Sequence, residues 1–299
     1  MHRAQEEGFR VELFLNRKDK LLVLIIAAFL LIVASAGLLF LGDSASPFIT
    51  VLSAAAVATV VLEVFRRLLC VMNSERKLME SSQFQTYQQT ESLLSVLFSL
   101  KSDLPLPGTR DWATSPDLLK WILVEILIRK PELVVEASSG VSTVLIAHAL
   151  RRLGRGRLIS LEHSEQYADS TRRFISLHGL DDIATVLHAP LQEYQLEKGS
   201  WLWYDMSRMK LDRKIDMLVI DGPPEGIQDL SRYPAIPLLF PSLSHEAIVV
   251  MDDGRRDGEK RIAAMWEEEF DCLSSEYLDM EKGAIFLQMN RRGDEVPGC

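Results

Sequence analysis

The feature that most constrains the fold is a short apolar run that leads into small residues, ELVVEASSGVST at residues 132–143. It predicts a buried strand that ends at Glu136, a turn around Gly140, and a helix immediately after that turn. A second run, LISLE at residues 158–162, predicts a neighbouring strand that ends on the carboxylate of Glu162. Free backbone N–H groups at such a turn, with a carboxylate beside them, suit a nucleoside-containing cofactor.

This segment differs from the dinucleotide fingerprint, which needs three glycines in the pattern G-x-G-x-x-G. Only Gly140 is present, and this disfavours a nicotinamide-dependent oxidoreductase. Ser142 and Thr143 open the helix, and Glu162 is placed to accept hydrogen bonds from ribose hydroxyls. Taken singly, each of these residues could belong to an ordinary turn or cap a helix; their mutual spacing favours a ligand site.

Helical and strand patterns alternate through the second half of the chain. Near-continuous apolar strands that alternate with helices predict a Rossmann-like, doubly wound α/β fold, with a mostly parallel seven-stranded sheet and a C-terminal antiparallel hairpin. Ligands in such folds bind beyond the carboxyl ends of the strands, where the strand order reverses. The predicted strands are 133–136, 157–161, 185–188, 215–220, 247–251, 272–278 and 284–289, with helical patterns at 142–153, 164–178, 232–239 and 258–270.

Three acids follow two of these strands. Asp221 comes after an apolar strand, and Asp252 and Asp253 end the next one. Because hard oxygen ligands suit Mg²⁺ or another divalent cation, this pattern predicts a metal site, although an Asp here could instead cap the following helix. His188 is a candidate base, although a lone histidine is more often structural, and Arg232 could bind an anionic acceptor.

Two apolar segments precede this domain. Residues 21–41 carry no charge and are long enough for the roughly 20 helical residues that cross a bilayer. Residues 47–65 form a second, marginal span that is interrupted by Glu63. The alternative, a hairpin buried in a soluble core, would need a far larger domain around it. The two segments therefore predict a transmembrane hairpin, with the lipid bilayer as a partner.

Basic residues fix the predicted orientation. They flank both ends of the hairpin and are missing from its turn, so both termini and the catalytic domain are expected in the cytoplasm. Small residues in the second span could let helices pack, either within the hairpin or between chains in a homo-oligomer. The predicted organisation is an N-terminal segment at 1–20, the hairpin at 21–70, a helical linker at 71–104 and the α/β domain at 105–299.

Charge and cysteine content exclude other classes. The formal net charge of -9 disfavours a nucleic acid partner, because phosphate binding needs a concentrated basic surface. The chain's 3 cysteines are too few and too scattered for a zinc cluster or a disulfide framework.

Six motifs carry a resemblance to a known family: WATSP at 112–116, EASSGVST at 136–143, LEH at 161–163, HAPL at 188–191, VIDGPP at 219–224 and MDDG at 251–254. In this order, over about residues 105–290, the chain resembles the class I S-adenosylmethionine-dependent methyltransferases. It is most similar to the branch of catechol and macrocin O-methyltransferases. That family usually has Gly where this chain has Ser138.

The resemblance implies that S-adenosylmethionine is the cofactor and assigns roles to residues. It implies a metal at Asp221, Asp252 and Asp253, the last of which is usually Asn in that branch. Together with His188, the first two acids are the candidate catalytic residues. The implied cofactor contacts are Glu136, Ser138, Gly140, Ser142 and Thr143 around methionine, Glu162 on the ribose, His163, Ala189 and Pro190 on adenine, and Asp221.

The expected function is methyl transfer to a hydroxyl of a glycan, a glycolipid or another membrane-associated acceptor. The aromatic segment WLWYD, in a predicted loop at 192–214, would form an acceptor-side wall or lid, or be packed by its own aromatic rings. The alternative is a membrane scaffold whose methyltransferase-like domain has lost catalysis; Ser138 favours it, and the retained acids oppose it.

Overall fold

The computed structural model describes residues 46–102, 104–109 and 112–289 of the 299-residue chain. The chain divides into two compact units, Met1–Ser82 and Gln83–Cys299. The predicted N-terminal segment, 1–20, and the first predicted span, 21–41, lie outside the described residues.

The long helix α2 (Ser46–Leu100) contains the second predicted span, 47–65, and most of the predicted linker. Within the residues that the structure describes, no helix combines the length and apolar character that a membrane crossing requires. The predicted span at 47–65 is therefore not supported. Glu63, which is partly buried on α2, pairs with Arg66 and Arg67, one turn further along.

The last turns of α2 belong to the second unit, in which Val96 and Leu100 are buried. Gln89 fixes this part of the helix to the start of α3 (Pro116–Arg129) through a pair of hydrogen bonds. Its side-chain nitrogen donates to Asp117 Oδ2 at 2.8 Å, and its oxygen accepts from the Asp117 N–H at 3.1 Å. The second unit thus begins before residue 105, where the sequence predicts the domain to start.

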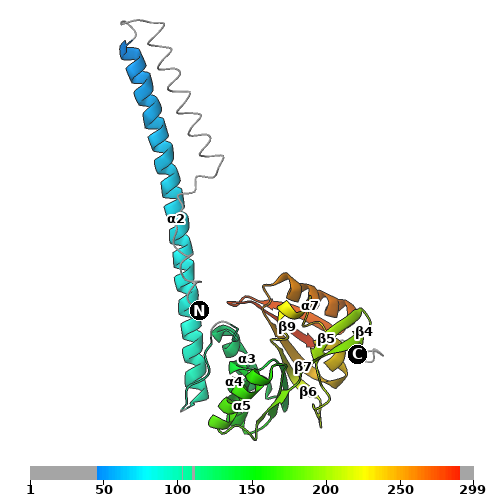
Figure 1. Ribbon diagram of the computed structural model, residues 1–299. Coiled ribbons are helices and arrows are strands. Elements are labelled where there is room, and N and C mark those ends of the chain that lie inside the picture. The colour runs from blue at the N-terminus through cyan, green and yellow to red at the C-terminus, as the bar shows by residue number, and fades with distance from the viewer. Residues whose placement is uncertain (1–45, 103, 110–111, 290–299) are drawn as a thin grey trace. The chain divides into compact units, whose positions relative to one another are not determined.

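The second unit is built on one seven-stranded sheet (Figure 1). Five neighbouring strands of this sheet are parallel, and the next strand, β9 (Ala284–Met289), runs antiparallel to both of its neighbours. This arrangement confirms the predicted Rossmann-like fold and its C-terminal antiparallel hairpin. In spatial order the strands are β3 (Ala184–His188), β2 (Arg157–Glu162), β1 (Leu133–Ala137), β6 (Ile215–Ile220), β7 (Leu243–Asp252), β9 (Ala284–Met289) and β8 (Leu273–Leu278).

Helices cover both faces of this sheet (Figure 1). Successive side chains of a strand point to opposite faces, so Val134 of β1 packs in one core and Leu133 and Val135 pack in the other. The first core lies under α3, α4 (Val141–Leu153) and α5 (Glu165–Leu177). The second lies under α6 (Ala235–Leu239) and α7 (Asp257–Glu269). Short 3₁₀ turns, Glu225–Ile227 and Phe240–Ser242, complete the connections on this side.

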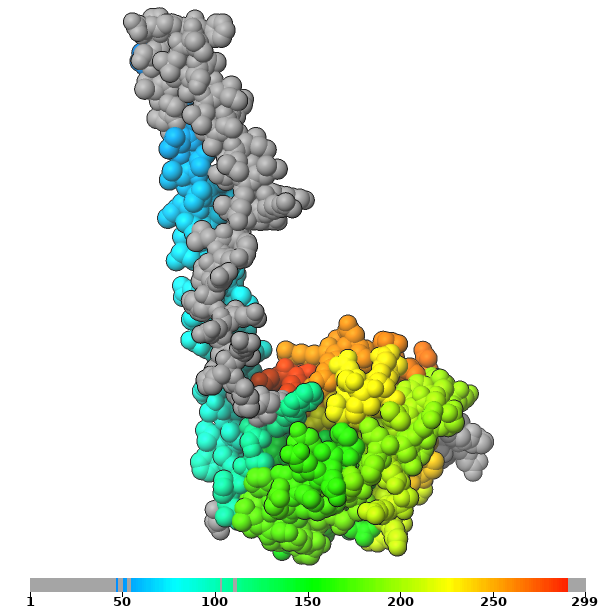
Figure 2. Space-filling model, in the orientation of Figure 1, coloured from blue at the N-terminus to red at the C-terminus, as the bar shows by residue number. Residues whose placement is uncertain are grey.

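A two-stranded sheet stands where the sequence predicts a loop. Strands β4 (Leu191–Leu196) and β5 (Gly199–Tyr204) form an antiparallel hairpin outside the main sheet. Trp203 and Tyr204, at the end of β5, are fully buried in the second core. The predicted helix at 232–239 is reduced to α6, which starts just after Pro234. In Figure 2 the segment that follows β6 (yellow) adjoins α7 (orange) on the surface.

Candidate active site

The strand order reverses at β1, which lies between β2 and β6. The turn after β1 is fixed between the carboxyl ends of these two strands. The Ser138 N–H donates to the Leu161 carbonyl of β2 at 2.9 Å, and the Asp221 N–H after β6 donates to the Ala137 carbonyl at 2.9 Å. This is the position at which open α/β sheets bind their ligands.

Buried hydrogen bonds shape this turn and the start of α4. Thr143 Oγ1 donates to Glu136 Oε2 at 2.6 Å and accepts from the Gly140 N–H at 2.9 Å. Glu136 is fully buried, and its second oxygen has no hydrogen-bond partner among the described residues. Burial raises the pKa of Glu136 to about 7, although the neighbouring hydroxyls of Ser142 and Thr143 lower it. Glu136 therefore organises the turn from inside the core.

Glu162 binds the same turn from the end of β2. Its Oε2 accepts from the Ser139 N–H at 3.0 Å and from the Ser139 hydroxyl at 3.2 Å, and its Oε1 accepts from the Ser164 N–H at 2.9 Å. His163 Nδ1 lies 3.1 Å from Glu162 Oε1, and the Ala189 N–H donates to the Glu162 carbonyl at 2.8 Å. The structure therefore brings the predicted ribose acid and two predicted adenine neighbours to one place.

Tyr204 is a site residue that the sequence did not single out. A Cβ built on Gly222 would lie 2.4 Å from the Tyr204 hydroxyl and 3.0 Å from the Cβ of Ser138. Gly222 therefore leaves room where the ends of β1, β5 and β6 meet. The Tyr204 hydroxyl is buried without a partner among the described residues, and burial raises its pKa further above the ordinary value. The only signal in the sequence was its place in an aromatic segment.

The three predicted acids converge. Side-chain oxygens of Asp221, Asp252 and Asp253 all lie within 4.8 Å of one another. Asp252 Oδ1 accepts from the Asp253 N–H at 2.6 Å, while Asp252 Oδ2 is buried without a partner among the described residues. Burial, together with the neighbouring negative charges, raises the pKa of Asp221 and of Asp252. A buried group of this kind needs a compensating positive charge.

Arg232 supplies that charge, in a role that the sequence analysis did not assign. Its side chain is 3 % exposed, and its Nη2 lies 2.6 Å from Asp253 Oδ2 and 3.6 Å from Asp221 Oδ1. The guanidinium also donates to the Asp252 carbonyl at 2.6 Å and to the Asp221 carbonyl at 3.3 Å. The Arg232 side chain therefore lies among the three acids and joins the ends of β6 and β7.

His188 is not brought to the acidic group. It ends β3, which is separated from β6 in the sheet by β2 and β1. In the strand register it lies opposite Glu162, on the side of the crevice where His163 and Ala189 lie. His188 therefore lies on the predicted cofactor side of the site.

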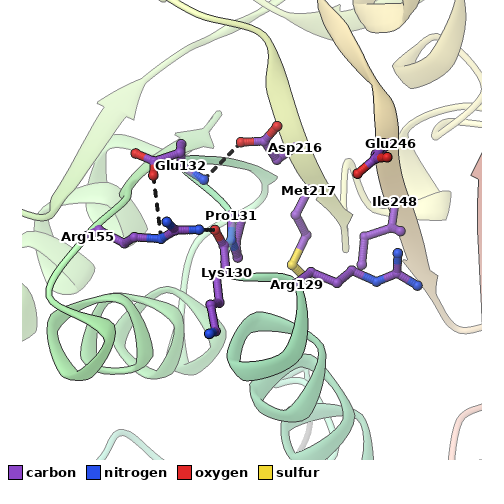
Figure 3. Close-up of a pocket in the computed structure, with 9 residues that line it drawn as sticks. All are labelled: Arg129, Lys130, Pro131, Glu132, Arg155, Asp216, Met217, Glu246 and Ile248. Carbon is purple, nitrogen blue, oxygen red and sulfur yellow. Dashed lines mark hydrogen bonds and ion pairs between the residues drawn. The ribbon is translucent and has the colours of Figure 1, made fainter.

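A cavity of about 310 Å³ opens at the amino ends of the central strands, opposite the crevice (Figure 3). It contains none of the candidate residues, because it lies at the amino ends of β1 and β6. Polar groups around it are engaged with one another: the Glu132 N–H donates to Asp216 Oδ2 at 2.9 Å, and Arg155 donates to the Lys130 carbonyl at 2.6 Å. Its lining consists of Arg129, Lys130, Pro131, Glu132, Arg155, Asp216, Met217, Glu246 and Ile248.

Comparison with known proteins identifies the domain around the crevice. Residues 137–254 match the family described as "Methyltransferase domain". This stretch, from the end of β1 to the residues after β7, is therefore similar to a methyltransferase domain. This confirms the predicted enzyme class, an S-adenosylmethionine-dependent methyltransferase, at the level of the domain.

Solved structures share this fold at low sequence identity. The S-adenosylhomocysteine-bound methyltransferase PaMTH1 of Podospora anserina is 15% identical, with a TM-score of 0.52 over 71% of this chain and 96% of that one. The S-adenosylmethionine complex of the O-methyltransferase TomG of Streptomyces achromogenes is 16% identical, with a TM-score of 0.48 over 70% and 96% of the two chains. At 15% identity the likeness to PaMTH1 is one of fold.

Proposed function

We propose that the protein transfers a methyl group from S-adenosylmethionine to an oxygen acceptor. The observation that carries this proposal is the contact of Glu162 with the turn after β1, at the point of strand-order reversal in a methyltransferase domain. The order of the six motifs, which resembles that of O-methyltransferases, favours oxygen as the acceptor atom. The methyltransferases PaMTH1 and TomG, which bind S-adenosylhomocysteine and S-adenosylmethionine, have related folds.

The residues around the turn fit such a cofactor. A Cβ built on Gly140 meets nothing within 4 Å, so there is open space over the start of α4. Ser138 has a φ of 94°, and its Cβ would lie 3.0 Å from a Cβ built on Gly222, so the side chain is directed towards the end of β6. We expect Glu162 to hold the ribose, Ser138, Gly140 and Ser142 to surround the methionine part, and His163, Ala189 and Pro190 to contact adenine.

The chemistry is an in-line displacement. S-adenosylmethionine supplies a methyl group on a sulfonium; a bond forms between this carbon and the acceptor oxygen while the carbon–sulfur bond breaks. The products are S-adenosylhomocysteine and the methyl ether, and the acceptor proton passes to a base. Asp221 directly follows β6 and Asp252 ends β7, and we assign these two carboxyl groups to the acceptor side. The protein orients the acceptor and excludes water.

Calorimetric titration of the full chain with S-adenosylmethionine and S-adenosylhomocysteine tests this proposal. We expect micromolar binding that falls at least tenfold in Glu162→Gln, because Gln keeps the size of the side chain but removes the charge that accepts from hydroxyls. Arg213→Gln, on the exposed surface, is the matched control. If neither compound binds, the proposal is refuted and the inactive scaffold, which Ser138 favours, takes its place.

We further propose that the acceptor is membrane-associated and that the domain acts in the cytoplasm. The uncharged run at 21–41 supports the membrane association. The cytoplasm is the compartment that holds S-adenosylmethionine, the proposed cofactor. A glycan or glycolipid hydroxyl fits this setting. Fractionation of cells that produce the full chain tests the anchor: we expect it in membranes after carbonate extraction, and recovery in the soluble fraction would contradict the proposal.

A further inference from the structure

The acids at the ends of β6 and β7 have the composition of a divalent-cation site. Oxygens of Asp221, Asp252 and Asp253 lie within 4.8 Å of one another, and carboxylate oxygens are the ligands that Mg²⁺ and Mn²⁺ prefer. Composition alone, however, does not decide whether a cation enters. The decisive question is whether these oxygens and the space between them are already occupied.

A positive charge already lies among them. Arg232 Nη2 lies 2.6 Å from Asp253 Oδ2, and Arg256 Nη1 lies 3.0 Å from the same oxygen. A Mg²⁺ ion on this oxygen would need a distance of about 2.1 Å, which puts it within about 5 Å of the Arg232 nitrogen. Two positive groups at this separation in a buried site repel one another strongly. Asp253 is thus satisfied by two guanidinium groups and is a poor ligand for a third cation.

Asp221 and one oxygen of Asp252 are engaged as well, whereas Asp252 Oδ2 has no hydrogen-bond partner among the described residues. Asp221 Oδ2 accepts from Thr114 Oγ1 at 3.2 Å, and Asp252 Oδ1 accepts from the Asp253 N–H at 2.6 Å. Arg232 cannot leave easily, because its guanidinium also donates to the main-chain carbonyls of Asp252 and Asp221. Breaking these bonds would leave two carbonyls without this donor, around a guanidinium side chain that is 3 % exposed.

We infer that Arg232 takes the place of the divalent cation, so that the methyl transfer proposed above proceeds at a site without a metal. This inference deepens the proposed function and rests on it for the reaction. Arg232 is a positioning residue: it holds two carboxylates and two strand ends in fixed relation, as a metal would. Unlike a metal, it offers no open coordination position to an acceptor hydroxyl. A protein carboxylate then takes the acceptor proton.

Binding of Mn²⁺ alone to the full chain tests the inference, followed by the loss of the electron paramagnetic resonance signal of the free ion. We compare the wild type, Asp252→Asn, Arg232→Met and the double variant. We expect the wild type and Asp252→Asn to bind Mn²⁺ equally weakly. Arg232→Met, which removes the charge but keeps much of the volume, should bind Mn²⁺ at least tenfold more tightly, and the double variant should lose this gain.

Two results would overturn the inference. One is a Mn²⁺ site in the wild type that disappears in Asp252→Asn; this comparison stands even where Arg232→Met fails to fold. The other is an Arg232→Met protein, folded by circular dichroism, that binds Mn²⁺ no better than the wild type. Failure of the proposed function would look different. If the wild type binds S-adenosylmethionine and also Mn²⁺ at this site, only the metal-free site is refuted. If the wild type binds neither S-adenosylmethionine nor Mn²⁺, only the methyl transfer is refuted.

Discussion

Replacement of Glu136 by Gln should make the protein more stable at alkaline pH and leave it almost unchanged at acidic pH. Glu136 is fully buried, and burial raises its pKa from the ordinary value of 4.5 to about 7. One pKa unit corresponds to about 1.4 kcal/mol, so the ionised carboxylate costs about 3 kcal/mol once the pH exceeds 7. Gln has the same shape, and its oxygen can accept the Thr143 hydrogen bond.

The direction of the effect follows from proton linkage. A group whose pKa is raised in the folded state contributes stability that is fully present below its unfolded pKa and is lost as the pH rises through the folded value. The contribution of Glu136 is therefore intact below about pH 4 and almost gone above about pH 8. Urea unfolding of the wild type and Glu136→Gln at a series of pH values measures this contribution. Other titrating groups contribute to both proteins, so their effects largely cancel in the difference.

We expect the difference in unfolding free energy between Glu136→Gln and the wild type to grow by about 2 to 3 kcal/mol between about pH 5 and pH 8. Glu268→Gln, at an exposed position of α7, is a matched control and should show no such growth. A constant difference across this range would refute the reasoning, because it would mean that Glu136 ionises as readily in the folded chain as in the unfolded one.

Further substitutions test the contacts around the crevice and at the opposite edge of the sheet. Gly222→Ala should reduce the unfolding free energy by about 1–3 kcal/mol, because its Cβ would lie 2.4 Å from the Tyr204 hydroxyl. Gly140→Ala should leave stability near the wild type but weaken S-adenosylmethionine binding measured by calorimetry, because its Cβ enters open space that the cofactor needs. Tyr204→Phe should not lower thermal stability, since the buried hydroxyl has no partner among the described residues. Asp216→Ala should cost about 1–3 kcal/mol in urea unfolding, because the N–H groups of residues 132 and 133 lose their acceptor.

The main sheet and the acids at its edge were predictable because their signals are local. The apolar runs that form β1, β2 and β6 have few alternatives, and parallel strands bring their carboxyl ends to one edge. Asp221 and Asp252 therefore had to lie close together once the strands were assigned.

The hairpin β4–β5 was missed because its signal is weaker. In β4 only Leu191, Tyr194 and Leu196 are partly buried, so the strand lacks a continuous apolar run, and the aromatic residues of β5 read equally well as a loop packed on itself. Its burial depends on Tyr233 and the second core, which come from distant parts of the chain. Periodicity within one segment cannot show such contacts.

The role of Arg232 could not be predicted for a related reason. A long basic side chain after a strand-end acid can point to solvent, to a ligand or into the protein, and the sequence around it is the same in each case. Its direction is set by the partners that folding supplies, which are the carboxylates of Asp221 and Asp253 and the carbonyl of Asp252. The sequence showed three acids that needed a positive charge, and it could not show that the chain provides that charge itself.

The same reasoning separates the two acids of the cofactor turn. Glu136 is inaccessible and bonded to Thr143, so its effect on a ligand must pass through the shape of the turn. Glu162 is also buried, but it accepts from Ser139 and Ser164 at the carboxyl end of β2. A ligand hydroxyl there would compete with the Ser139 hydroxyl for the same oxygen. Substitution of Glu136 should thus change stability more than affinity, and substitution of Glu162 should change affinity more than stability. Measuring the unfolding free energy and the cofactor affinity of Glu136→Gln and Glu162→Gln would decide whether Glu136 shapes the turn while Glu162 binds the ligand.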